Sequence, residues 1–503
     1  MTEKKVMNRG LVVLGAILIQ LALGAIYAWS VFTPGLIASS PKEVVDQYGA
    51  YSKAPMLKLK ADAFENMSAE LKEPRANLKS LELKESTLEN KDEKAKIKAE
   101  QKEIILTMNS IILKYVDKDT LNSLSYRFSK TQTQVIFALG LAFFAIVMVF
   151  AGKKLKTWGP RKLALYGGLV LGLGYILAGL LGGLNFWFYA IFIGVVGGAG
   201  IGLAYVVPIA VGMQWFPDKK GMITGLAVAG FGFGAMGWVK LAGSWGHLIA
   251  NIGLPSTFII YGVAFAIMVV VGSMWMVFPP TGYKPKGYVP PEVSAVNKPI
   301  GTRDFNSTSM LKTPQFYLIF LTFVFSAGAG LMSIGLMKLY PIEALRAGGM
   351  DTAAASAVAG TAMAVFFSLA NGLGRILWGT LSDKLGRKTS IIIMTATQGI
   401  LVLLFTYMAG NEYLLYLGAT LIGFNFGGNF ALFPTITADT FGAKNVGQNY
   451  PFIFLAYGVG GILGPILGGR LGDLGNFPLA FTISGIAVLL GTVLTIMVKP
   501  AKR

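Results

Sequence analysis

Arg375 is the residue of this chain that most needs a chemical explanation. It lies in the stretch NGLGRILWGTLSDKLGRK, from Asn371 to Lys388, whose first half is otherwise apolar. Counted back from Asp383 along a helix, Arg375 would lie about 12 Å inside a membrane, too deep for its side chain to reach water easily. A permanent cation at that depth needs a partner. Its planar guanidinium suits a carboxylate ligand, and the alternative is a structural arginine bonded to carbonyls at helix ends.

Two further cations, Lys240 and Lys338, fall within predicted membrane spans, whereas none of the 25 acidic residues clearly does. The membrane interior therefore holds cations without an obvious counterion from the protein, and a substrate anion could take that place. We expect Lys240 to lie at the outer interface, where lysine side chains extend to water. Lys338 is placed near the outer mouth, as a candidate on the substrate path.

Polar and aromatic side chains near Arg375 could complete a small site. Asn371 precedes Arg375 by one helical turn and shares its face. Tyrosine and tryptophan can shape an apolar pocket while donating one hydrogen bond, although within a membrane they also pack between helices or face lipid. The candidates within predicted spans are Tyr27, Trp29, Tyr205 and Tyr457. Gln132 and Gln134 are expected to cap a helix at the interface.

Several kinds of chemistry are disfavoured by composition. The chain has no cysteine and one histidine, His247, so thiol chemistry and a histidine-ligated metal site are not expected. We find no Walker lysine motif and no soluble domain that could bind ATP. A primary pump is therefore disfavoured, and we expect no enzyme activity, no catalytic residue, no cofactor and no metal.

The elements that must position these residues are membrane helices. Of 503 residues, 54% are hydrophobic, 14% are charged and 63 are glycine, and apolar stretches of about 20 residues recur. The first apolar run follows a basic N-terminus and resembles a membrane helix more than a cleaved signal peptide. The expected fold is all-α with twelve spans, at Leu11–Phe32, Thr131–Ala151, Leu163–Leu181, Phe186–Met213, Met222–Trp245, Ser256–Phe278, Gln315–Leu339, Thr352–Gly379, Ser390–Ala409, Tyr413–Ile436, Gly447–Gly468 and Phe477–Val498.

The spans are divided by two polar segments. We expect helix 1 in residues 1–36, an extracytoplasmic helical insert in 37–127, the rest of an N-terminal six-helix half in 128–278, a cytoplasmic linker in 279–313 and a C-terminal six-helix half in 314–503. The insert is rich in leucine, glutamate and lysine, and its charges nearly balance. A helical hairpin is predicted there, with Pro74 limiting one helix. Its role is structural or partner-binding, or else it senses a ligand.

The lysines and arginines predict an orientation. With the N-terminus inside, the inside segments hold 22 basic residues, while the short outside loops hold two, Arg346 and Arg470. Both termini are then expected to be cytoplasmic, and we expect a multi-pass monomer in the inner (plasma) membrane. Because much of the net charge of +19 is a topology signal, nucleic-acid binding is not expected.

The two halves repeat each other. Gly152 and Gly159 match Gly379 and Gly386 at one offset, and a nearly equal offset relates a second set of glycines and prolines. That second set is Gly197, Pro208, Gly221 and Gly234, matched by Gly423, Pro434, Gly447 and Gly460. Two like halves around a midplane site are a recurring plan of secondary transporters.

Two loops carry a family resemblance. GTLSDKLGRK, from Gly379 to Lys388, resembles the helix 8–9 loop signature of the major facilitator superfamily, and GKKLKTWGPRK, from Gly152 to Lys162, resembles the equivalent helix 2–3 loop. Lys156 stands there where the other loop has Asp383, so the charge relay is not expected in the first half. The resemblance implies a gating role for both loops, through Gly379, Asp383, Gly386, Arg387, Gly152, Gly159 and Arg161.

A narrower resemblance covers nearly all of the chain except the insert. AIYAWSVFTPGL, SKTQTQVIFALGLAFF, WFPDKKGMITGLAVAGFGFGA and NGLGRILWGTLSDKLGR are similar to the oxalate/formate antiporter family, which is related to the monocarboxylate transporters. The resemblance implies that Arg375 binds the substrate carboxylate and that Asn371 and Tyr205 line the site. Oxalate-handling members carry a lysine in helix 11, but this chain has GQNYPFIFLAYGVGGILG there.

We therefore expect a secondary transporter of small monocarboxylates such as lactate, pyruvate or formate, working by alternating access. A small carboxylate anion, a proton and the lipid bilayer are the expected partners, and the coupling is proton symport or anion exchange. The alternatives are an oxalate/formate-type dicarboxylate antiporter and a membrane receptor that senses through the insert. A cation or drug exporter would need acids within the membrane, and none is evident.

Overall fold

The computed structural model describes residues 7–37, 40–48, 57–87, 91–217, 219–243, 245–280, 282–283, 285, 304–337 and 339–499. These residues form helices, and no strand occurs among them, which confirms the predicted all-α class. Lys338 and most of the predicted linker 279–313 lie outside the described residues.

Eleven helices in the described part of the chain are long and apolar enough to cross a membrane. In the N-terminal half they are α1 (Arg9–Leu23) continued by η1 (Gly24–Ala28) and α2 (Trp29–Ile37), α7 (Lys130–Trp158), α8 (Pro160–Leu181), α9 (Phe186–Tyr189) continued by η3 (Ala190–Gly197) and α10 (Gly198–Trp215), α11 (Lys220–Ala242) and α12 (Leu248–Ser273). The predicted sixth span, Ser256–Phe278, corresponds to α12, although α12 begins earlier and ends at Ser273. It contains a kink at Gly253 (φ 76°), two residues before Pro255.

The C-terminal half repeats this plan. It contains α13 (Ser307–Met310), α14 (Pro314–Leu336), α15 (Leu339–Ala347), α16 (Thr352–Thr361) continued by η4 (Ala362–Phe367) and α17 (Ser368–Leu385), α18 (Arg387–Met408), α19 (Glu412–Phe441), η5 (Ala443–Asn445), α20 (Val446–Asp473) and α21 (Phe477–Met497). The predicted tenth span corresponds to α19, a helix of 30 residues that is not among the eleven. Its apolar run is interrupted by Asn425 and Asn429, which are buried within the half.

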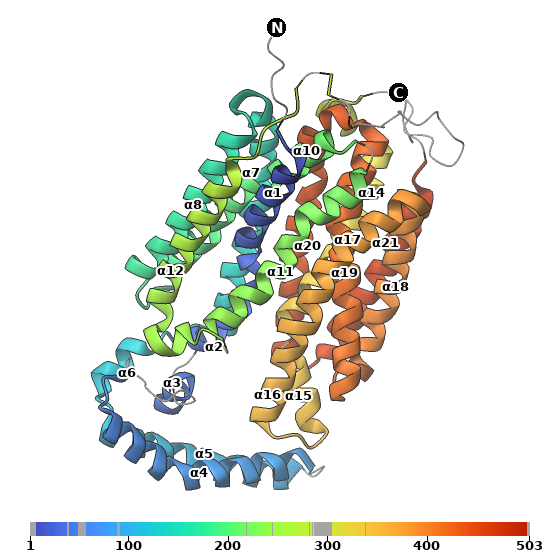
Figure 1. The fold of residues 1–503 in the computed structure, drawn as a ribbon. Coiled ribbons are helices and arrows are strands. Elements are labelled where there is room, and N and C mark those ends of the chain that lie inside the picture. Colours follow the sequence, from blue (N-terminus) through green and yellow to red (C-terminus); the bar gives the residue numbers. More distant parts are fainter. Residues whose placement is uncertain are drawn as a thin grey trace.

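The two groups of helices stand side by side (Figure 1). The start of α1 and the end of α21 lie at one end of the molecule, here called the termini end. The helices between α2 and α7 lie at the opposite end, here called the insert end.

Close helix crossings join the two halves at the termini end. A Cβ atom on Gly379 of α17 would lie 2.4 Å from the carbonyl oxygen of Gly221 in α11, and one on Gly152 of α7 would lie 2.5 Å from that of Gly447 in α20. A side chain at these positions would therefore separate the helices. The glycines of the two repeated loops thus let the halves touch.

The insert consists of α3 (Pro41–Tyr48), α4 (Ala61–Thr87), α5 (Lys91–Tyr115) and α6 (Lys118–Leu124). The prediction that Pro74 limits a helix was wrong, because Pro74 lies inside α4. A proline there costs about 3 kcal/mol. Apolar residues on both sides of it, including Leu71 and Leu78, belong to the insert's own buried cluster, and this packing keeps the helix continuous.

Two ion pairs connect the insert to the C-terminal half. Lys79 of α4 lies 3.5 Å from Asp351, and Arg346 of α15 lies 3.8 Å from Glu85 of α4. Since α2 and α7 anchor the insert in the N-terminal half, it bridges both halves at the insert end (Figure 1).

Candidate functional site

The side chain of Arg375 is fully buried in the middle of the molecule, at 0% exposure. Its Nε donates a hydrogen bond to Oδ1 of Asn371 at 3.2 Å, one turn earlier on α17, and its Nη1 donates to the carbonyl of Val228 in α11 at 2.9 Å. Nη2 is buried and has no acceptor among the described residues. The guanidinium therefore keeps donor capacity for a further ligand.

Two phenylalanine rings lie against the guanidinium. The Cζ atom of Arg375 is 4.0 Å from the ring centre of Phe430 and 5.2 Å from that of Phe231. Such contacts favour a cation through the ring quadrupole, but they supply no negative charge. No carboxylate among the described residues forms an ion pair with Arg375. Sequence reasoning missed both rings, because they come from α19 and α11 and carry no local signal.

Four tyrosine hydroxyls are within electrostatic reach of the guanidinium. They belong to Tyr27, Tyr205, Tyr450 and Tyr457. The hydroxyls of Tyr27 and Tyr457 are hydrogen-bonded to each other at 2.8 Å. The buried hydroxyls of Tyr205 and Tyr450 have no hydrogen-bond partner in the described part of the chain. Tyr450 was missed, although it precedes Tyr457 by two helical turns and so shares its face of α20.

Local departures from α-helix geometry contain one of the site residues and precede two others. The 3₁₀ segment η1 contains Tyr27, the π-helical η3 precedes Tyr205, and the π-helical η4 precedes Arg375. Such segments are frequent at functional sites because they change the direction of side chains. Gly24 begins η1 where a Cβ would lie 2.2 Å from the carbonyl oxygen of Phe231. This close approach brings α1 against α11 beside the site.

Trp29 occupies a different position from the tyrosines. Its indole Nε1 donates to the carbonyl of Thr133 at 2.9 Å, so its donor ties η1–α2 to α7 rather than pointing at Arg375. Trp29 instead lines a cavity of about 270 Å³ that lies between the halves toward the insert end. Tyr27 lines the same cavity. Both predicted aromatic residues of the first span thus line the cavity, but Tyr27 bonds to the C-terminal half and Trp29 bonds to α7.

The wall of this cavity comes from both halves. The N-terminal half contributes Tyr27, Trp29, Ser30, Thr33, Pro34, Ile37, Gln134 and Phe137. The C-terminal half contributes Ile334, Gly335, Leu339, Ile342 and Ser356. Gln132 caps α7 together with Ser129, as expected, whereas Gln134 lies in the cavity wall.

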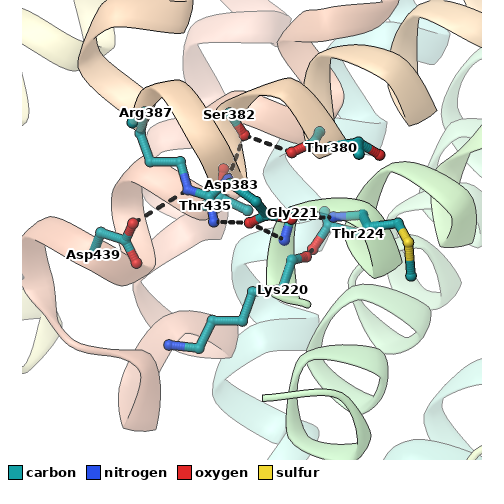
Figure 2. A network of polar contacts seen from close by, with 12 residues as sticks. Lys220, Gly221, Thr224, Thr380, Ser382, Asp383, Arg387, Thr435 and Asp439 are labelled. Carbon is teal, nitrogen blue, oxygen red and sulfur yellow. Dashed lines mark hydrogen bonds and ion pairs between the residues drawn. The ribbon is translucent and has the colours of Figure 1, made fainter. Parts of the chain in front are cut away.

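A polar network joins the halves at the termini end (Figure 2). The carboxylate of Asp383 accepts hydrogen bonds from the backbone N–H groups of Gly221 at 3.2 Å and Met222 at 3.0 Å, in the first turn of α11. It also pairs with Arg387, which reaches Asp439 at 3.3 Å. A carboxylate at a helix N-terminus is favoured by the helix dipole and by the unpaired N–H groups. This network holds α17 against α11.

Among the described residues, the equivalent loop of the first half forms no such network. Lys156 donates to Oδ1 of Asn445 at 3.2 Å, and Arg161 donates to the carbonyl of Met274. Gly159 and Gly386 end the preceding helices in both halves, with φ of 79° and 86°, where a side chain would be strained. The two loops share a backbone plan, but Lys156 makes a bond to a neutral group where Asp383 makes charged ones.

Comparisons with known proteins agree with this geometry. A sequence model described as Major Facilitator Superfamily matches residues 104–367 and 350–503. The uncharacterized MFS-type transporter YhjX of Escherichia coli is 30% identical over 68% of this chain and 79% of its own length. The oxalate:formate antiporter of Oxalobacter formigenes is 26% identical, over 74% of this chain and 83% of its own.

Two further similarities are more distant. Apicoplast pyruvate carrier 1 of Toxoplasma gondii is 26% identical over 63% of this chain and 66% of its own. Among solved structures, the transporter FucP in the outward conformation matches with a TM-score of 0.53 at 16% identity, over 75% of this chain and 91% of that one. The FucP likeness supports the two-half helical fold described above.

Proposed function

Because this chain belongs to the major facilitator superfamily, a family of multi-pass membrane transporters, we propose that it is a secondary active transporter of small monocarboxylates. Arg375 is the observation that carries this proposal. The guanidinium is fully buried, no protein carboxylate among the described residues pairs with it, and one of its nitrogens has no acceptor there. A substrate anion would supply both the missing charge and the missing acceptor.

The groups around Arg375 match what one carboxylate needs. Its oxygens can accept hydrogen bonds from Nη2 of Arg375 and from the buried hydroxyls of Tyr205 and Tyr450. A charged hydrogen bond of this kind contributes about 1.5–3 kcal/mol, and more in a site without water. Asn371 holds Nε and so fixes the plane of the guanidinium.

Among the described residues of the site Arg375 is the single cation, which favours one carboxylate over two. The face of α20 next to Arg375 presents Tyr450 and Tyr457, and α20 has no lysine or arginine before Arg470 in its last turn. A second carboxylate would therefore be buried without a charged partner, which is strongly unfavourable. This supports a substrate with one carboxylate over oxalate.

Anion exchange is the mode of coupling that we propose. Proton symport would need a group near Arg375 that takes up the proton, and no aspartate, glutamate or histidine among the described residues bonds to Arg375. Without its anion, the carrier would have to change conformation with an uncompensated buried charge. Bound substrate removes that charge in each direction of the cycle.

We assign the termini end to the cytoplasm of the cell that bears this protein in its plasma membrane, because the basic residues concentrate on that side. The described conformation then faces outward, with the cytoplasmic side closed by the Asp383 network and by the glycine crossings. Alternating access would open this side and close the cavity at the insert end.

The test is counterflow in proteoliposomes with labelled acetate, lactate, pyruvate, formate and oxalate. We expect uptake of labelled monocarboxylates only when an unlabelled carboxylate is present on the opposite side. Uptake driven by a proton gradient without an opposing anion would replace exchange by symport. If the folded protein moves none of these anions, the proposed function is wrong.

A further inference from the structure

We propose that the substrate is a monocarboxylate with an apolar tail, and that the tail occupies the cavity between Arg375 and the insert end. The inference rests on the proposed function, since it takes Arg375 as the site of the carboxylate. It adds the chemistry of the rest of the substrate, which Arg375 does not specify.

The cavity wall has the character of an apolar binding site. Most of its side chains are hydrocarbon or aromatic, and none of the described residues that line it carries a charge. Two of its polar groups bond within the protein, because Trp29 donates to the carbonyl of Thr133 and Thr33 donates to the carbonyl of Trp29. Few polar groups therefore remain to replace the water around a hydrophilic tail.

Tyr27 connects the cavity to the carboxylate site. It lines the cavity, and its hydroxyl is within electrostatic reach of Arg375. One turn nearer the termini end, α11 and α17 are in close contact, since a Cβ atom on Gly225 would lie 2.1 Å from the backbone carbonyl oxygen of Arg375. A ligand whose carboxylate is bound by Arg375 would therefore extend its tail past Tyr27 into the cavity toward the insert end.

The size of the cavity exceeds what the smallest carboxylates need. Its volume is about 270 Å³, whereas an apolar cavity of roughly 150 Å³ is enough for benzene. Formate or acetate would leave most of this space without contacts. A ring or a chain of several carbons would fill it and exclude water.

The experiment measures binding of a series of acids to the purified full-length protein by calorimetry. The series is acetate, butanoate, hexanoate and benzoate, with oxalate and malonate as acids that have two charges. Burial of one methylene contributes about 0.8 kcal/mol, so each added methylene should tighten binding about fourfold until the cavity is full. Benzoate should bind at least tenfold more tightly than acetate, and the two dicarboxylates should bind more weakly than acetate.

Gly335→Leu tests whether the tail lies in this cavity. A Cβ atom on Gly335 would meet Oε1 of Gln134 at 3.5 Å, an ordinary contact, so the new side chain can enter the cavity. We expect hexanoate and benzoate to bind about tenfold more weakly to this variant, with acetate unchanged. Gly237→Leu is the control, because nothing lies within 4 Å of its Cβ position and Gly237 does not line the cavity. Ser356→Leu, on the facing helix α16, gives a second filled cavity if Gly335→Leu fails to fold.

The outcomes separate this inference from the proposed function. Equal affinities along the series, or equal losses for acetate and benzoate in both filled-cavity variants, would overturn the apolar tail and leave carboxylate transport standing. If no acid of the series binds to the folded protein, both proposals fail.

Discussion

The hydroxyl of Tyr27 lies 2.8 Å from the hydroxyl of Tyr457, and this hydrogen bond joins the N-terminal and C-terminal halves between residues 430 positions apart. Both side chains are buried, at 2% and 0% exposure. Tyr27 also lines the cavity between the halves, so under the proposed function the pair lies on the path of a substrate to Arg375. The bond is suited to open and close with each transport cycle.

Tyr27→Phe and Tyr457→Phe should therefore have effects that are not additive. Either variant loses the same hydrogen bond, which contributes about 0.5–1.5 kcal/mol, so we expect each to change the exchange rate by about two- to tenfold. The double variant should differ little from the more severe single variant. Exchange rates in proteoliposomes give the comparison, and fully additive effects would show that the two hydroxyls act separately.

Arg375→Lys should weaken carboxylate binding sharply, because lysine keeps the charge but loses the planar fork. Arg375→Ala should nearly abolish binding, since the anion would then enter a buried site without any compensating charge. Calorimetry on monodisperse protein measures both. Lys240→Ala is the matched control, because Lys240 lies in the last turn of α11 at the insert end and should have little effect. Unchanged affinity in a folded Arg375→Ala variant would make Arg375 structural.

Asp383→Asn should favour opening of the termini end. The carboxylate accepts two backbone hydrogen bonds from α11 and pairs with Arg387, and charged bonds of this kind contribute about 1.5–3 kcal/mol each. The chain has no cysteine, so a single cysteine introduced by Ser356→Cys would measure, through its rate of labelling, how accessible the cavity is. Opening of the termini end should close this cavity. We expect Asp383→Asn to slow labelling of that cysteine by an impermeant thiol reagent at least fivefold.

Lys156→Ala is the control for the Asp383 network, since Lys156 donates a hydrogen bond to the neutral side chain of Asn445. In the Lys156→Ala variant, the cysteine of Ser356→Cys should be labelled at a rate within twofold of that in the protein carrying Ser356→Cys alone. An equal slowing by Lys156→Ala and Asp383→Asn would contradict the asymmetry between the two loops.

Removal of the insert between Val44 and Asp119, with a short flexible linker in its place, should leave exchange largely intact. The insert has its own apolar cluster, and the ion pairs described between it and the C-terminal half involve partly exposed side chains. Exposed pairs typically contribute about 0.2–1 kcal/mol each. Flux assays on the correctly inserted variant test this, and a complete loss of flux would make the bridge between the halves part of the mechanism.

The insert should face the outside of the cell. A cysteine introduced at the exposed residue Ser80 of α4 should react with an impermeant thiol reagent in intact cells. Gly183→Cys, at the same end of the molecule, should react in the same way, whereas Thr157→Cys at the opposite end should react only after permeabilisation. The reverse pattern would overturn the orientation that the basic residues predict.

Local properties of the chain determined the helices and the central cation. A bilayer sets the length of an apolar span, so eleven of the twelve predicted spans correspond to helices that meet the criteria for crossing a membrane. The tenth predicted span corresponds to α19, which is not among those helices because Asn425 and Asn429 interrupt its apolar run. Arg375 could be singled out because its charge contradicts its apolar neighbours, and Asn371 because helical spacing is a local rule. The Pro74 boundary failed since packing against α5 outweighs local propensity.

The partners of Arg375 depended on the tertiary structure. Val228, Phe231, Phe430 and Tyr450 come from three other helices, and no pattern along the chain places them beside α17. The Tyr27–Tyr457 bond, the cavity wall and the contacts of the insert with α15 likewise join distant segments. Hydropathy and helical periodicity act over a few turns, whereas the packing of glycine-rich faces sets which helices meet. The sequence could therefore identify a buried cation that needs an anion, but only the fold determined which donors and which apolar wall would receive it.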